Sequence, residues 1–360
     1  MFLDFCATPF ATSRYVTTLP SADLRLSSLA QWVASTLGTD DFAMAPASAD
    51  ASFRRYFRLT LREPHGIAQD VATLIVMDAP PPMEDCVPFI HVARLLHDAG
   101  VNVPRVLAQD LQRGFLLLTD LGPTTYLAAL DASTARALYG DAFSALVRFQ
   151  GVSCAGELPP YDEAMLRREL EIFPEWYVTR HLGCTLSEPQ RAVLDRVFTQ
   201  IVASNLAQPR VFVHRDYHSR NLMVSSPNPG VLDFQGAMYG PVTYDAVSLM
   251  RDAYIEWDEE EELDWTIRYW ERARAAALPV HGDFGDFWRD FEWMGVQRHL
   301  KVLGIFARLS HRDGKDSYIR DMPRTLRHLR RACARYRDLE PINTLLDTLT
   351  DRVPAIGHTF

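Results

Sequence analysis

The chain reads His214-Arg215-Asp216-Tyr217-His218-Ser219-Arg220-Asn221-Leu222-Met223 directly after the β-branched and aromatic run Val211–Val213. A second apolar run follows this stretch and ends at Asp233. An aspartate, a nearby asparagine and a second aspartate at a strand end form the arrangement that ATP-dependent phosphoryl transfer requires. In it, Asp216 accepts the proton of the attacking hydroxyl, and Asn221 and Asp233 hold Mg²⁺ against the phosphates. The stretch therefore predicts a kinase-type site.

The bulk composition is that of an ordinary soluble protein. With 360 residues the chain is longer than one hydrophobic core usually supports, so two lobes are expected. The net charge of −9 argues against nucleic-acid binding, and no apolar run is long enough to span a bilayer. The first residues lack the pattern of a secretory signal, and five scattered cysteines suggest neither disulfides nor a zinc site. We expect a cytoplasmic protein without nucleic-acid or membrane partners; the oligomeric state stays open.

Hydrophobic periodicity divides the chain into a small sheet lobe and a mainly helical lobe, an α+β architecture. We expect an N-terminal extension at 1–20, a nucleotide-binding N-lobe at 21–120 and a catalytic, acceptor-binding C-lobe at 121–360. The turn-forming sequence Asp120-Leu121-Gly122-Pro123 is the predicted hinge. In the N-lobe, strands are expected at 52–59, 74–77, 104–108 and 115–118, and helices at 24–37 and 89–96. In the C-lobe, helices are expected at 135–149, 162–181, 188–206, 244–254, 259–277, 284–309 and 323–336, interrupted by a strand-loop-strand section at 211–234.

The catalytic and metal motifs resemble those of the aminoglycoside phosphotransferase and choline kinase-like family, a branch of the protein-kinase fold. His214-Arg215-Asp216, Asn221 and Asp233-Phe234 carry this resemblance. Four further stretches resemble, more narrowly, the bacterial anomeric kinases of N-acetylmuramate and N-acetylglucosamine: 52–57, 76–81, 240–245 and 298–309. The resemblance implies a bilobal protein-kinase-like fold with ATP and Mg²⁺ as cofactors. It also implies phosphorylation of an amino sugar at the anomeric hydroxyl, giving a sugar 1-phosphate in cell-wall recycling.

Four features depart from the family pattern. Arg215 stands where the broad family usually has glycine, and Gln235 replaces the glycine that follows Asp233-Phe234. The third strand of the small lobe carries no lysine for the ATP phosphates, and no glycine-rich loop precedes it. We expect Arg54 or Arg55 to substitute for the lysine. The complete set of predicted nucleotide-binding residues is Ser52, Phe53, Arg54, Arg55, Asp120 and Leu121.

Several other polar side chains are candidates for contacts with the acceptor. Arg298 forms a basic cluster with His299 and Lys301, which would suit a carboxylate on the acceptor. An aromatic stripe at helical spacing is more often core, and long basic side chains also reach the surface, so structural roles stay open. The predicted acceptor-binding residues are His218, Arg251, Trp176, Arg180 and Arg298.

For other polar residues we favour structural roles. We expect His214 to brace the loop through backbone carbonyls and Asp245 to cap a helix or tie down the loop. The acidic run 258–262 suits a helix N-terminus, and the arginines between 324 and 335 suit a solvated helix face.

Two alternative functions remain open at this stage. In the first, the chain is a kinase whose acceptor is choline, homoserine or an aminoglycoside rather than an amino sugar. Alternatively, the missing lysine and the altered glycine would make the chain a nucleotide-binding pseudokinase, although the intact Asp216, Asn221 and Asp233 argue against it.

Overall fold

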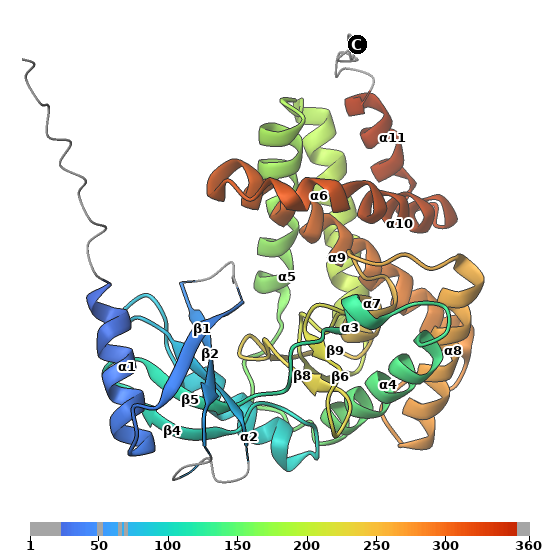
Figure 1. Ribbon diagram of the computed structural model, residues 1–360. Helices are drawn as coiled ribbons and strands as arrows, with labels where there is room; N and C mark the ends of the chain where they lie inside the picture. The colour runs from blue at the N-terminus through green and yellow to red at the C-terminus, as the bar shows by residue number, and fades with distance from the viewer. Residues whose placement is uncertain (1–22, 49–52, 64–66, 68–70, 351–360) are drawn as a thin grey trace, which may run out of the picture.

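The N-terminal part of the chain folds into a five-stranded antiparallel sheet with the order β1-β2-β3-β5-β4 (Figure 1). The computed structural model describes residues 23–48, 53–63, 67 and 71–350, so the predicted extension 1–20 lies outside the described residues. The strands are β1 (Phe42–Ser48), β2 (Arg55–Leu61), β3 (Thr73–Asp78), β4 (Val106–Asp110) and β5 (Phe115–Thr119). The four predicted strands are present with ends shifted by a few residues, and β1 is an additional one.

One helix packs on each face of this sheet because its strands alternate side chains between two cores. Helix α1 (Leu24–Leu37) buries Leu29 and Val33 against Leu59 and Val76. On the other face, Met77 belongs to the core that includes α2 (Val87–Asp98). Both helices were predicted. The C-terminus of α1 is fixed by Gly38, whose φ of 76° lies in the left-handed region that glycine adopts readily.

The C-terminal part is mainly helical, with two short two-stranded sheets next to the cavity between the lobes. Strand β6 (Arg210–Val213) pairs with β9 (Met238–Pro241), and β7 (Leu222–Met223) pairs with β8 (Gly230–Val231). The helices are α3 (Tyr126–Ala129), α4 (Ala135–Gly151), α5 (Glu163–Leu170), the π-helical η2 (Phe173–His181), α6 (Glu188–Ala207), α7 (Tyr244–Met250), α8 (Glu259–Ala275), α9 (Phe284–Asp313), the 3₁₀-helical η3 (Asp316–Asp321), α10 (Met322–Arg335) and α11 (Glu340–Thr350). The fold is therefore the bilobal, protein-kinase-like one that the sequence predicted.

Two predicted helices are shorter than expected. The predicted helix 162–181 is divided into α5 and η2, with Pro174, which has no backbone N–H, in the first turn of η2. The predicted helix 244–254 ends as α7 at Met250. Within the helical lobe, α9 crosses η2 so closely that a side chain at Gly304 would meet the carbonyl carbon of Ile172 at 2.6 Å. This glycine therefore permits the close packing.

The arginines of α10 form the predicted solvated face only in part: Arg327 is exposed, whereas other arginines pair with buried carboxylates. Arg331 pairs with the buried Glu262 and Arg335 with the buried Glu292, so this helix face packs against α8 and α9. Asp258 caps α8 by accepting a hydrogen bond from the Glu261 N–H, which confirms that the acidic run begins a helix. The sequence did not predict the pairs with Glu262 and Glu292, because these carboxylates lie far from α10 in the sequence.

Besides the α2 core, polar contacts also join the two lobes. Arg58 on β2 binds the Asp120 carboxylate at 2.6 Å and the Gly122 carbonyl at 3.0 Å. Asn102, in the loop before β4, accepts a hydrogen bond from the Val231 N–H at 2.8 Å. These contacts position the strands of the sheet over the loop that follows β6. In the described part of the chain, no helix has the length and apolar character needed to cross a bilayer.

Candidate active site

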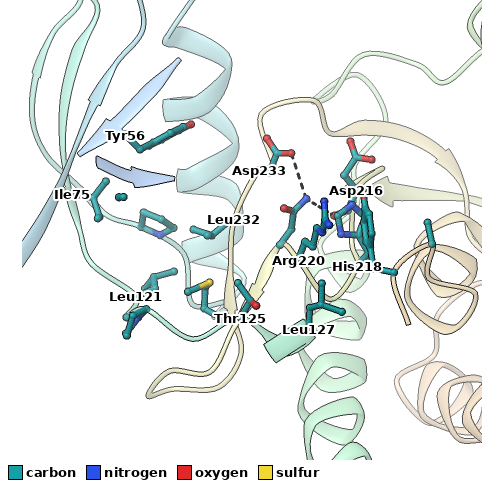
Figure 2. A pocket seen from close by; sticks show the side chains of 18 of the residues that line it. Tyr56, Ile75, Leu121, Thr125, Leu127, Asp216, His218, Arg220, Leu232 and Asp233 are labelled. Atoms are coloured by element: carbon teal, nitrogen blue, oxygen red, sulfur yellow. Dashed lines mark hydrogen bonds between the residues drawn. The ribbon is translucent and has the colours of Figure 1, made fainter. Parts of the chain in front are cut away.

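A cavity of about 750 Å³ lies between the lobes and brings together residues from distant parts of the chain. Tyr56 and Ile75 from the sheet line one side, and the segment Leu118–Pro123 lines the connection between lobes. Asp216 and Asp233 line the opposite side (Figure 2). Of the predicted site residues, the cavity lining includes Asp120, Leu121, Asp216, His218, Asn221, Asp233 and Arg298.

The loop after β6 is held from below by two buried side chains. The Asp245 carboxylate accepts hydrogen bonds from the backbone N–H groups of His214 at 2.7 Å and Arg215 at 2.9 Å. Burial raises the pKa of Asp245 to about 7, although these two bonds lower it. The His214 ring lies 3.0 Å from the Leu232 carbonyl, and burial lowers its pKa to about 4. The predicted structural roles of His214 and Asp245 are thus confirmed.

Asp216 is an ionised carboxylate in a positively charged surrounding. Burial alone would raise its pKa, but the charges of Lys301, His218 and Arg298, with that of Arg215, lower the value to about 2. Lys301 and Arg298 project from one face of α9, three residues apart. At neutral pH Asp216 can therefore accept a hydrogen bond from a hydroxyl group in the cavity.

Asn221 and Asp233 face each other next to Asp216. The Asn221 side-chain amide donates to the Asp216 carbonyl at 2.9 Å and lies 3.4 Å from the Asp233 carboxylate (Figure 2). Gln235 donates to the other Asp233 oxygen at 2.7 Å, so the residue that replaces the family's glycine fixes this carboxylate. Mg²⁺ prefers oxygen ligands and usually takes one or two carboxylates from a protein. The amide and carboxylate oxygens of this pair fit that preference.

Arg215 adopts a backbone conformation that favours glycine. Its φ is 77°, in the left-handed region, which explains why a glycine is usual at this position. The side chain compensates by binding Glu169 at 2.5 Å and the Gly236 carbonyl at 3.3 Å. Glu169 also contacts Lys301 at 3.1 Å. An arginine is thus accommodated here by a buried network of charges.

A second group of residues lines the side of the cavity remote from the sheet. Tyr254, Phe306 and Tyr318 form a wall, with ring centroids 6.0 and 5.2 Å apart. The Arg220 guanidinium lies 3.8 Å from the centre of the Tyr254 ring. His218 packs edge-on against the same ring, and burial lowers its pKa. This side of the cavity therefore combines aromatic surface with positive charge.

The N-lobe arginines proposed for the phosphates do not line the cavity. Because strand β2 alternates its faces, Tyr56 and Arg58 point to the cavity while Arg55 points to the α1 side. There Arg55 binds Asp78 at 2.6 Å. Arg54 binds Glu84 at 2.9 Å. The placement of these two arginines does not fit their predicted role, Phe53 is 64% exposed outside the lining, and Ser52 lies outside the described residues.

Three predicted acceptor residues also lie away from the cavity. Arg251 is buried and binds Glu262 at 3.4 Å and Glu292 at 3.2 Å, which makes it part of the helical core. Trp176 packs against the core from η2, and Arg180 on the same helix is exposed. Their placement gives these side chains no direct contact with a ligand in the cavity.

Sequence reasoning missed several residues that line the cavity. The sequence did not identify Tyr56 and Arg58 as lining residues, because an alternating strand pattern does not show which face of the strand meets a ligand. Arg220 lay inside the quoted motif, but nothing in the sequence linked it to Tyr254 or Tyr318. Within the described residues, no group of three or more His, Cys, Asp or Glu side chains could hold a metal, so the metal candidate is the mixed amide and carboxylate pair.

The fold and the cavity define a kinase-type phosphotransferase. A model of the phosphotransferase enzyme family matches residues 43–284. The N-acetylmuramate/N-acetylglucosamine kinase of Pseudomonas aeruginosa is 53% identical over 312 residues, 87% of this chain and 90% of that protein. The protein of the same name in Neisseria meningitidis is 48% identical over 337 residues, 92% of this chain and 98% of that protein. The chain belongs to this phosphotransferase family, as its motifs predicted.

A solved structure of distant sequence has the same fold. The choline kinase of Cryptosporidium parvum is 10% identical, with a TM-score of 0.58 over 89% of this chain and 99% of that one. Membership of a kinase family implies a nucleotide as the phosphoryl donor.

Proposed function

We propose that this chain phosphorylates N-acetylmuramate and N-acetylglucosamine at the anomeric hydroxyl, with ATP as donor and Mg²⁺ as cofactor. The observation that carries the proposal is the ionised Asp216 beside Asn221 and Asp233 in one cavity. The choice of acceptor rests on the relatives described above, whose names give both sugars. The basic side chains in the lining also suit an anionic sugar better than a cation such as choline.

The nucleotide would occupy the part of the cavity next to the sheet. Ile75, Leu118 and Leu232 offer apolar surface for a base, and the backbone of Leu118–Leu121 offers hydrogen-bonding groups at the junction of the lobes. On this basis we place the end of the nucleotide-binding lobe at residue 120. Asn221 and Asp233 would hold Mg²⁺, whose positive charge would lie next to the phosphates in place of the missing lysine.

Asp216 orients the acceptor and takes up its proton. Because its pKa is lowered to about 2, it is a weak base, and proton transfer falls late in the reaction. An anomeric hydroxyl is more acidic than an ordinary alcohol, so a weaker base suffices to accept its proton. The rate then depends mainly on positioning and on charge, as in other phosphoryl transfers. No side chain becomes phosphorylated.

The test is ³¹P NMR of the purified protein with ATP, Mg²⁺ and each sugar, with choline, homoserine and an aminoglycoside in parallel. We expect a sugar 1-phosphate signal that falls by about a thousandfold in Asp216→Asn, since general-base groups contribute about 10²–10⁴ in rate. ATP binding should stay within about twofold of wild type, since Asp216 acts on the acceptor. Asp264→Asn, on the exposed surface of α8, is the matched control.

Three outcomes contradict parts of the proposal. Full activity of Asp216→Asn would exclude this carboxylate as the base. Product from another acceptor alone would keep the kinase and discard the sugar. ATP-dependent thermal stabilisation without product from any acceptor would instead favour the pseudokinase.

A further inference from the structure

Four basic side chains line the cavity, and three of them are already bound to protein groups. Arg58 binds Asp120 at 2.6 Å. Lys301 binds the Tyr244 hydroxyl at 2.9 Å and Glu169 at 3.1 Å. These contacts fix the positions of the first two cations and satisfy much of their charge.

Arg298, the third, is also bound within the protein. It is 3% exposed, donates to the Arg215 carbonyl at 3.3 Å and lies over the Tyr244 ring. Its charge lowers the pKa of Asp216. Arg298 therefore supports the loop that carries Asp216.

Arg220 is different from these three. In the described part of the chain, no carboxylate or carbonyl group forms an ion pair or hydrogen bond with its guanidinium. The guanidinium instead lies over Tyr254, 3.8 Å from the ring centre, and 5.6 Å from the centre of Tyr318. Stacking on aromatic faces holds a guanidinium in place and leaves its in-plane N–H groups free to donate. Such a group matches a carboxylate, which it can bind through two parallel hydrogen bonds.

The position of this cation is fixed relative to the loop that carries Asp216. Asp252 accepts a hydrogen bond from the Ser219 N–H at 2.8 Å and another from the Tyr254 N–H at 2.9 Å. One buried carboxylate thus ties the residue before Arg220 to the ring on which Arg220 stacks. Figure 2 shows Arg220 beside His218, on the side of the cavity away from Tyr56 and Ile75. A group bound by Arg220 therefore belongs to the acceptor.

We infer that Arg220 binds the lactyl carboxylate of N-acetylmuramate and so determines how well this acid is used relative to N-acetylglucosamine. The inference rests on the proposed function. The two sugars differ only in the lactyl ether at C3, which carries the negative charge. Since C3 is separated from the anomeric C1 by one ring atom, a sugar with its anomeric hydroxyl at Asp216 places the carboxylate within reach of a neighbouring side chain. His218 is a weaker candidate for the cation, because burial lowers the pKa of its ring.

The experiment is steady-state kinetics of the full chain with both sugars, saturating Mg²⁺ and varied ATP. In Arg220→Gln, the KM for N-acetylmuramate should rise about ten- to a hundredfold, the range of a charge-assisted hydrogen bond. The KM for N-acetylglucosamine and that for ATP should stay within about twofold. Arg220→Lys should retain part of the preference, since it keeps the charge but loses the two-bond geometry. Arg180→Gln removes the same charge from an exposed position outside the cavity and is the matched control.

A substrate variant makes the test independent of folding effects. The methyl ester of N-acetylmuramate has no charge, so wild type and Arg220→Gln should use it equally well. Equal losses for both sugars in Arg220→Gln, or a raised KM for ATP, would overturn the inference and assign Arg220 to the phosphates or to loop structure. Absence of product from either sugar with wild-type protein would overturn the proposed function itself. An unchanged KM for N-acetylmuramate would overturn the inference and leave the proposed function intact.

Discussion

Two substitutions of Arg215, the residue before Asp216, separate the cost of backbone strain from the contribution of an ion pair. Its φ of 77° is unfavourable for any residue with a side chain. Its guanidinium lies 2.5 Å from the carboxylate of Glu169, which is 4% exposed. Arg215→Met keeps the backbone strain and removes the ion pair, whereas Arg215→Gly removes both.

The contacts of Glu169 set the size of the effect. Removing one partner of a buried ion pair costs about 3–5 kcal/mol, and the lower end applies because Lys301 still binds Glu169. Arg215→Met should therefore lose about 3 kcal/mol of unfolding free energy. Arg215→Gly should lose only about 2 kcal/mol, because relief of the left-handed strain returns about 1 kcal/mol. With an unfolding entropy of about 2.1 cal/mol/K per residue, these losses correspond to roughly 4 and 3 °C in Tm.

Scanning calorimetry at neutral pH measures both variants, with Arg268→Met as a control. Arg268 forms an exposed pair with Asp264, whose loss should cost less than about 1 kcal/mol. A Gly variant as stable as wild type would refute the claim that the ion pair outweighs the strain. A Met variant at least as stable as the Gly variant would refute the claim that the backbone is strained.

Two further predictions concern the metal and the base. Asp233→Asn should weaken Mg²⁺-dependent nucleotide binding by at least about tenfold, because the amide brings no charge to the metal. Calorimetric titration with ADP, with and without Mg²⁺, measures this affinity. An unchanged affinity would contradict the assignment of Asp233 to the metal. Lys301→Met removes the cation that lowers the pKa of Asp216 most. The Asp216 carboxyl should then keep its proton to higher pH, so kcat/KM should decline at a higher pH than in wild type as the solution is acidified. Identical pH profiles would show that Lys301 does not control this ionisation.

The sequence predicted the loop and its flanking strands well, because the residues that define it are close neighbours in the chain. His214, Asp216 and Asn221 fall within eight positions, and the apolar runs on either side of them predict the flanking strands. Most helices follow from local periodicity for the same reason. The fold class could therefore be predicted before any coordinates were known.

The remaining contacts depend on pairings between distant segments, which periodicity does not encode. Arg251 was predicted to contact the acceptor, but it is buried in the helical core, where it pairs with Glu292 on α9. Arg55 and Arg58 are chemically alike, and only the packing of α1 on one face of the sheet shows which one meets the cavity. Arg220 gains its significance from Tyr254, which α7 and the turn after it bring into place.

The contacts of Arg58 and Asn102 have a mechanical consequence for the two lobes. Arg58 fastens the chain to the sheet as far as Gly122, and the Thr124 carbonyl is bound to the Val224 N–H of the helical lobe at 2.9 Å. Only Pro123 lies between these two attachments. The loop before β4 is attached to the helical lobe through Asn102 and Val231, and α2 is attached to it through the contact of Phe89 with Phe234. A base held along Leu118–Leu121 would therefore lie on the segment that belongs to the sheet, whereas the loop that carries Asp216 belongs to the helices.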